Sequence, residues 1–309
     1  MARSKTKLTE EQRRERREAQ QRQLEQALDR LTTTEGWRRW LRTRATLHRY
    51  SLRNTLLLAH QAEIRRMQLT HVAGFRAWLK LGRYVRKGER GLSIWAPMRV
   101  RDRDSDDPDA KRTIFRPAAV FDVSQTEPLP DTEPAPLEPP GGCAPIDGDS
   151  HAHLLPRLEQ LARGIGYRVG WPEEIPGEAK GLCDRRPERR QISVLAGLAP
   201  NERVAVLIHE LCHALLGDGD QTRGMGCDLE EVVVESASYV ACATAGLAID
   251  MAAVPYVASW AGERDPATVV REAAALIDEL ARTIETALQP EDDQAEADGE
   301  SVSVTEALA

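Results

Sequence analysis

The sequence predicts an α+β protein of two domains, on three observations. Charge is segregated: residues 1–100 contain 24 Lys and Arg against 9 Asp and Glu, a net charge of +15, whereas the rest of the chain carries −22. A stretch with 7 of the 18 prolines follows the basic part, at residues 128–145, too many for a helix or a central strand. A helical His-Glu-x-x-His segment lies in the acidic part. With 309 residues the chain exceeds one domain of typical size, so we place the domain boundary at the prolines.

We predict five segments in chain order. They are a charged helical extension (1–36), a basic α+β domain (37–126), a proline-rich linker (127–149), a helix-rich domain (150–288) and a disordered acidic tail (289–309). The extension carries leucines at helical spacing, and the tail is acidic and lacks aromatic residues. Apolar residues at helical spacing predict one more amphipathic helix over residues 266–288.

Composition excludes several classes of protein. The chain has no run of about 18 uncharged apolar residues, and no apolar segment follows the charges at its start. Its five cysteines form an odd set without a Cys-x-x-Cys pair, which argues against a disulfide framework and a cysteine-based zinc knuckle. We therefore expect a cytoplasmic protein without a membrane span and with reduced thiols.

The basic domain is predicted to bind single-stranded nucleic acid. After Gly36, apolar residues at helical spacing alternate with arginines, which predicts helices with one buried and one cationic side; the arginines are Arg38, Arg39, Arg42, Arg44, Arg49 and Arg53. A helix and a small twisted sheet should follow, over residues 72–100. Cations that track phosphates and aromatic rings that stack on bases would hold a single strand.

Two features of this domain bear on its binding surface. A glycine-flanked turn gathers four cations, Arg83, Arg86, Lys87 and Arg90, beside backbone N–H groups that can donate to phosphate. The tryptophans are ambiguous, because Trp37, Trp40 and Trp78 could instead form the core of a small domain.

Several blocks in this region carry a family resemblance. They are Tyr50-Ser51 with Asn54, then VAGFRAW, LGRYVRKGERG, WAP and, at 121–126, FDVSQT. In this order they resemble the N-terminal single-stranded-DNA-binding domain of ArdC-type antirestriction proteins over about residues 37–126. The resemblance implies binding of unpaired DNA and protection of incoming mobile-element DNA, and the positions that carry over are Ser51, Asn54, Trp78, Gly82, Lys87 and Gly88. The chain departs from the pattern where Glu-Pro follows FDVSQT and where the Asp-rich loop RDRDSDDPDAKR interrupts the sheet.

The acidic domain carries a metal-binding motif. The segment 206–217, VLIHELCHALLG, contains His209, Glu210 and His213 in the His-Glu-x-x-His spacing. On a helix, positions i and i+4 differ by about 40° around the axis, so both imidazoles can share one metal ion. We predict Zn²⁺ at this site, although the motif alone leaves the identity of the divalent ion open.

A third ligand is expected from the segment CDLEEVVVESASYVACATAGL, a second helix. We predict Glu235, because a carboxylate in an apolar stretch is costly unless a cation or a metal pairs with it. Glu231, one turn earlier on the same face, is the alternative, but a capping box with Asp228 would already explain that residue.

This layout resembles the gluzincin metallopeptidases, and over about residues 150–260 it is similar to the ImmA/IrrE family. With a metal bound, Glu210 would act as the general base and a peptide amide would be hydrolysed. The segment Gln191–Leu195 is predicted as the second strand of a hairpin that could pair with an extended peptide substrate, and an ordinary structural hairpin fits the sequence equally well. Two alternatives stay open: a regulatory metalloprotease of the ImmA/IrrE type that cleaves a repressor, and a DNA-binding protein with a silent metal site.

Overall fold

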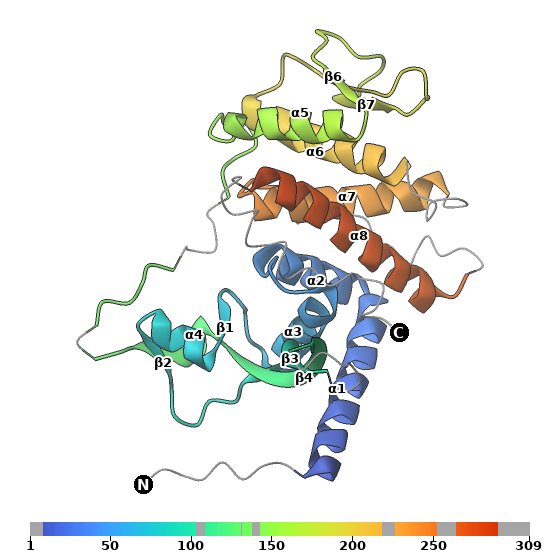
Figure 1. Cartoon of the computed structure of the whole chain (residues 1–309). Coiled ribbons are helices and arrows are strands. Elements are labelled where there is room, and N and C mark those ends of the chain that lie inside the picture. The colour runs from blue at the N-terminus through green and yellow to red at the C-terminus, as the bar shows by residue number, and fades with distance from the viewer. Residues whose placement is uncertain are drawn as a thin grey trace. The chain divides into compact units, whose positions relative to one another are not determined.

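The computed structural model describes residues 9–102, 109–130, 132–137, 143–217, 226–251 and 264–289. Part of the Asp-rich loop (103–108) and the predicted acidic tail, apart from Gln289, lie outside the described residues. The described part mixes helices and strands, which confirms the α+β class (Figure 1). None of the described helices is long and apolar enough to span a membrane.

The chain divides into two compact units. The first comprises Met1–Arg30 and Arg53–Glu138, and the second comprises Leu31–Leu52 and Pro139–Ala309. The sequence analysis assigned residues 37–52 to the first domain, whereas this division groups them with the C-terminal part of the chain. The reason is that the helix within them packs against the helix Cys227–Thr244 and forms buried ion pairs with the last helix of the chain.

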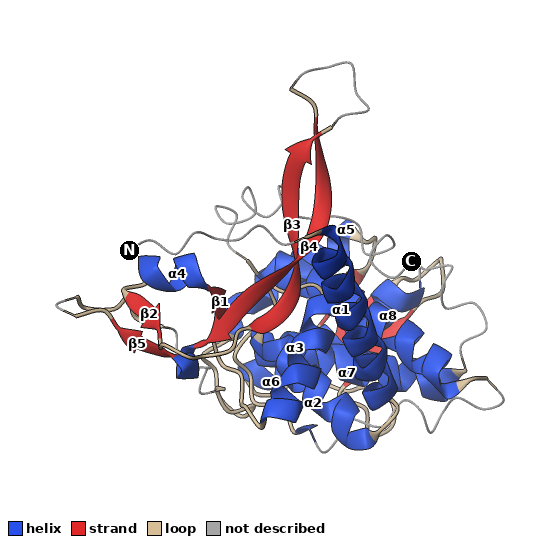
Figure 2. Ribbon diagram, turned by 90° about the horizontal axis from the view of Figure 1, so that it is seen from below, coloured by secondary structure: helices blue, strands red, loops and turns tan. Residues whose placement is uncertain are grey.

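The first unit combines helices with short sheets. Its elements are α1 (Glu10–Leu31), α3 (Leu52–Arg65), β1 (Val72–Gly74), α4 (Phe75–Lys80), β2 (Arg83–Val85), β3 (Leu92–Arg101), β4 (Lys111–Asp122), the short 3₁₀ helix η1 (Val123–Gln125) and β5 (Thr126–Pro128). An antiparallel sheet has the order β1-β4-β3, and β2 pairs with β5. Figure 2 shows β3 and β4 as a long two-stranded ribbon. Their register runs from Leu92 opposite Val120 to Arg101 opposite Lys111.

Two carboxamides on α3 cover the free edge of β3. The side chain of Asn54 accepts from the backbone N–H of Trp95 and donates to its carbonyl, both at 2.9 Å. Gln61 makes the same pair of bonds with Ser93, both at 2.8 Å. These amides replace the missing strand neighbour, so the buried half of β3 leaves no backbone group unsatisfied at these positions.

The second unit is a helical stack with a small sheet. Its elements are α2 (Thr34–Thr46), the 3₁₀ helix η2 (Ala152–Leu154), α5 (Leu155–Gly164), β6 (Arg168–Gly170), β7 (Gly181–Asp184), β8 (Gln191–Val194), α6 (Pro200–Gly217), α7 (Cys227–Thr244) and α8 (Pro266–Leu288). The last helix has the bounds predicted from its periodicity, and the Asp265 side chain caps it by accepting from Thr268 N–H. In Figure 1, α5 and α6 lie above α7 and α8; α5 packs against both α6 and α8, α7 packs against both α6 and α8, and α2 packs on α7.

The small sheet corrects one expectation. Its order is β6-β8-β7, with β8 parallel to β6 and antiparallel to β7. The predicted hairpin is present, but its second strand, β8, is central and has neighbours on both sides. Among the described residues the edge strands of this sheet are β6 and β7, so an extended peptide that joins the sheet would pair with one of them, not with Gln191–Leu195.

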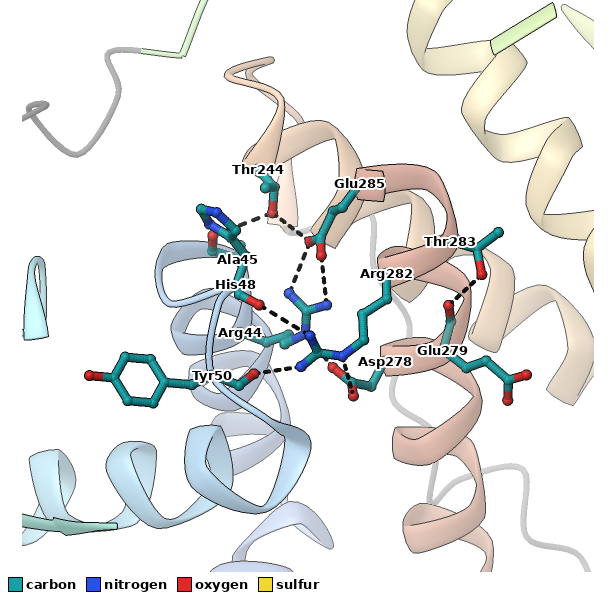
Figure 3. A network of polar contacts seen from close by, with 10 residues as sticks. All are labelled: Arg44, Ala45, His48, Tyr50, Thr244, Asp278, Glu279, Arg282, Thr283 and Glu285. Carbon is teal, nitrogen blue, oxygen red and sulfur yellow. Dashed lines mark hydrogen bonds and ion pairs between the residues drawn. The ribbon is translucent and has the colours of Figure 1, made fainter. Parts of the chain in front are cut away.

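The core of the second unit contains a cluster of ions that the sequence analysis placed on a cationic surface (Figure 3). The side chain of Arg44, on α2, is fully buried. Its Nε donates to Asp278 at 2.5 Å, and its two terminal nitrogens donate to the two oxygens of Glu285, each at 2.9 Å. Arg282 donates to the second oxygen of Asp278 at 3.0 Å, and Thr244 donates to Glu285 at 3.0 Å. Two cations thus balance two carboxylates, and the cluster joins α2, α7 and α8.

Candidate functional site

Helix α6 brings the metal-binding motif together as the spacing predicts. The rings of His209 and His213 lie one turn apart in an edge-to-face arrangement, with centroids separated by 5.0 Å. Both rings are largely buried, with side chains 22% and 16% exposed. The opposite face of α6 is apolar and buried, with Val204, Leu207, Ile208 and Leu211 among its core residues, so packing fixes the direction in which the two imidazoles point.

Helix α7 supplies a carboxylate between the two rings. Its Glu231 places one oxygen 3.6 Å from His209 Nε2 and the other 3.4 Å from His213 Nε2. Among the described residues, these three side chains form a group whose ligand atoms all lie within 4.8 Å of one another. Donors bound about 2.1 Å from one ion in a tetrahedron are about 3.4 Å apart, so two imidazoles and one carboxylate at these distances fit a divalent ion of the zinc class.

The third ligand predicted from sequence, Glu235, lies on the other side of His209. Its Oε1 is 3.8 Å from His209 Nδ1, and Glu235 is not part of the group of three. The argument that set Glu231 aside also fails, because α7 begins at Cys227 with Gly226 as its N-cap, so Glu231 has no capping role. The geometry favours Glu231, the alternative ligand, over Glu235.

Two residues of this site were missed by the sequence analysis. Glu230 holds the second nitrogen of His213, with Oε1 3.0 Å from Nδ1, and Arg185, which follows β7, makes an ion pair with the same carboxylate. A carboxylate behind a ligating histidine fixes the ring orientation and makes the ring a better ligand. The acidic pair Glu230-Glu231 was visible in the sequence, but which member faces the metal side depends on how α7 packs against α6.

The electrostatics of the site suit metal binding. Burial and the neighbouring His213 lower the pKa of His209 to about 4, and a hydrogen bond from His213 lowers the pKa of Glu231. Burial opposes charge on His213, yet hydrogen bonds with Glu231 and Glu230 outweigh it and raise its pKa. At neutral pH His209 is therefore neutral and Glu231 ionised, which are the forms that metal ligands need. The raised pKa of His213 favours its protonated form, so a metal ion has to displace a proton from this ring.

Glu210 is held against the edge strand β7. The side chain is buried, and burial raises its pKa to about 7, a value suited to a general base. A Cβ at Gly181 would lie 2.5 Å from Glu210 Oε1 and 2.6 Å from a methyl group of Val206, so only glycine allows this approach. The predicted base therefore lies between α6 and the strand whose outer edge is available to a peptide.

Some of the predicted DNA-binding residues around α3 and α4 are buried and structural, whereas others reach the surface. Trp78 is 1% exposed and its Nε1 donates to the carbonyl of Phe121, so it is a core residue and its ring cannot stack on bases. Asn54 is buried and bound to β3, so its amide is structural. Arg53 lies over the ring of Trp95 at 4.5 Å, whereas Ser51, directly before α3 and grouped with the second unit, is exposed.

The cationic turn is held by the FDVSQT block. Arg83 donates to the hydroxyl of Thr126, and Arg86 donates to Glu89 and to the carbonyl of Ser124. Gln125 donates to Glu89 and to the carbonyl of Arg90. Two of the four predicted cations thus bind within the fold, while the side chains of Lys87 and Arg90 are exposed.

Comparisons with known proteins agree with the resemblance of the N-terminal part. Residues 9–123 match the model of the N-terminal domain of anti-restriction factor ArdC. No curated protein matches the chain significantly. Among solved structures, the metal-free crystal structure of the antirestriction ArdC protein from R388 plasmid has a TM-score of 0.43 and 21% sequence identity, covering 82% of this chain and 87% of that one. Its Mn(II)-bound structure has a TM-score of 0.43 and 19% identity, covering 82% and 90%. The match over residues 9–123 shows that the N-terminal part of the chain contains a domain of the ArdC N-terminal family.

Proposed function

We propose that the chain is a single-stranded-DNA-binding antirestriction protein whose second unit is a gluzincin-like, metal-dependent peptide hydrolase. The observation that supports the hydrolase most is the convergence of His209, His213 and Glu231 beside the buried Glu210. The family match and the basic N-terminal part support binding of unpaired DNA and, with it, protection of incoming mobile-element DNA.

The residues of the second unit have distinct roles in this proposal. His209, His213 and Glu231 hold a divalent ion, for which Zn²⁺ is our first choice. Such an ion, when bound, acidifies water and polarises a substrate carbonyl. Glu210 accepts a proton from the attacking water at its carboxylate and returns it to the leaving amine, and burial keeps its pKa near neutrality for both transfers. The edge of β7 aligns an extended peptide by backbone hydrogen bonds.

Metal titration of the full chain tests the ligand set. After treatment with a chelator, the protein should bind one equivalent of Zn²⁺ or Mn²⁺ by calorimetry. Glu231→Gln should weaken this binding more than 100-fold, whereas Glu235→Gln should weaken it less than tenfold, because Glu235 touches only the outer nitrogen of His209. The reverse order would return Glu235 to the role of third ligand.

Peptide cleavage tests the chemistry. A quenched-fluorescent peptide mixture should be hydrolysed by the metal-loaded protein, and Glu210→Gln should reduce the rate by about 10²- to 10⁴-fold with metal binding retained. Cleavage that survives in this variant would remove Glu210 from the mechanism.

A DNA-binding assay separates the remaining alternatives. A labelled single-stranded oligonucleotide should bind more tightly than the matching duplex, with an affinity that falls as salt rises. DNA binding without cleavage would indicate a silent metal site. Cleavage without DNA binding would indicate a regulatory metalloprotease of the ImmA/IrrE type.

A further inference from the structure

The ribbon formed by β3 and β4 extends beyond the part of the sheet that α3 covers. Asn54 and Gln61 bind β3 at Trp95 and Ser93, and the pairing with β4 continues for six more residues to Arg101. The side chains of Pro97, Met98 and Arg99 on β3 are exposed, in contrast to the buried first half of the strand. Figure 2 shows this outer half of the ribbon projecting from the rest of β3 and β4.

One face of the outer ribbon combines an aromatic ring with cations. Residues directly opposite in the register share a face, and side chains two apart along a strand point the same way. The register pairs Pro97 with Phe115, Arg99 with Thr113 and Arg101 with Lys111, so these six side chains lie on one face; we call it the Phe115 face. Four of them, Arg99, Arg101, Lys111 and Phe115, are exposed and carry either a positive charge or an aromatic ring.

The ring of Phe115 is unusual for its exposure. Its exposed fraction is 45%, and within the described residues Phe75 is the other exposed aromatic side chain, at 50%. Trp37, Trp40 and Trp78, for which the sequence left both stacking and a core position open, are buried in contrast. An exposed ring on a flat strand surface offers a platform for an unpaired base, and duplex DNA keeps its bases stacked inside and out of reach of such a ring.

The charge on this face suits a polyanion. Arg99 lies about 6.6 Å, the distance between alternate residues of a strand, beyond the level of Phe115 along the ribbon. Arg101 and Lys111 lie opposite each other one such step further. Asp102 and Asp109 follow the last paired residues, Arg101 and Lys111, so the series of cations along the ribbon ends there. A single strand would therefore lie along the shaft of the ribbon rather than across its tip.

We propose that the Phe115 face binds single-stranded DNA, with one base stacked on Phe115 and phosphates held by Arg99, Arg101 and Lys111. This proposal rests on the DNA-binding function proposed above and assigns it to a surface of the ribbon instead of the turn at Arg83 to Arg90. The opposite face, with Met98, Ile114, Arg112 and Arg116, serves as an internal comparison, because it also carries exposed apolar and basic side chains.

Substitutions of Phe115 test the stacking. In the full chain, Phe115→Leu keeps an apolar side chain but removes the aromatic face, and should weaken binding of a labelled single-stranded oligonucleotide about 5- to 100-fold. Phe115→Trp should bind at least as tightly as the original protein. Met98→Ala, on the opposite face, should change the affinity less than twofold. Equal affinity of the leucine and tryptophan variants would overturn the stacking.

Substitutions of the cations test the phosphate contacts. Replacing Arg99, Arg101 and Lys111 together by glutamine should make the slope of log K against log salt shallower by about 2, since each neutralised phosphate of a single strand contributes about 0.7. The control Arg112→Gln with Arg116→Gln, on the other face, should leave the slope unchanged. If the unaltered protein does not bind single strands, the proposed function fails; if it binds and all ribbon variants bind equally well, only this assignment of the surface fails.

Discussion

Replacing Arg44 by methionine should destabilise the second unit by about 3–5 kcal/mol. The variant keeps a side chain of similar length but removes the guanidinium group. That group contacts one oxygen of Asp278 and both oxygens of Glu285. Their side chains are 1% and 8% exposed, so water cannot replace the lost charge. Breaking a buried ion pair by removing one partner typically costs this amount, because an uncompensated charge stays behind.

Urea unfolding followed by circular dichroism measures the effect. With a slope of about 2–3 kcal/mol per molar urea, a loss of 3–5 kcal/mol lowers the midpoint by about 1–2 M. Arg163→Ala is the matched control in the same unit: its ion pair with Glu159 spans 3.8 Å, its side chain is 65% exposed, and such surface pairs contribute about 0–1 kcal/mol.

A triple variant separates charge from packing. Adding Asp278→Asn and Glu285→Gln to Arg44→Met removes the two negative charges and should recover most of the lost stability, because neutral amides are far less costly to bury than unpaired carboxylates. A midpoint for Arg44→Met within 0.3 M of the Arg163→Ala control would refute the reasoning, as would a triple variant less stable than the single one.

The other predictions concern the metal centre. Glu230→Ala should lower the affinity for Zn²⁺ about 10- to 100-fold in calorimetry. The ring of His213 then loses the carboxylate that orients it, whose Oε1 lies 3.0 Å from Nδ1. An unchanged affinity would show that α6 alone orients the ring. Gly181→Ala should change the metal affinity less than threefold but reduce the rate of peptide cleavage at least tenfold, because the new methyl group displaces the carboxylate of Glu210. Full activity of this variant would mean that the carboxylate does not need its present position.

Local spacing was sufficient for the features that lie within one element. The i, i+4 histidines and the glutamate between them lie on one helix, so the period of the helix alone brings His209 and His213 together. The same holds for α8, whose apolar periodicity and proline predict its bounds. The hairpin of β7 and β8 also followed from local signals, since its strands are close in sequence.

Choices between equivalent residues required the tertiary structure. Three glutamates on α7 have similar local surroundings, and only the packing of α7 on α6 directs Glu231 to the Nε2 atoms of both histidines, Glu230 to Nδ1 of His213 and Glu235 to Nδ1 of His209. The residue pattern indicates which face of a helix is polar, but the residues that contact this face lie in another part of the chain.

The sequence by itself determined the α+β composition, the position of the helix with the His-Glu-x-x-His motif and the segregation of charge, because these depend on composition and on residues a few positions apart. Tertiary structure alone decided which polar and aromatic side chains are available. Arg44, read as part of a cationic surface, pairs with Asp278 234 positions away, and Trp78 enters the core while Phe115 stays exposed. Burial is a property of the whole fold, since a side chain loses contact with water only when distant segments pack over it.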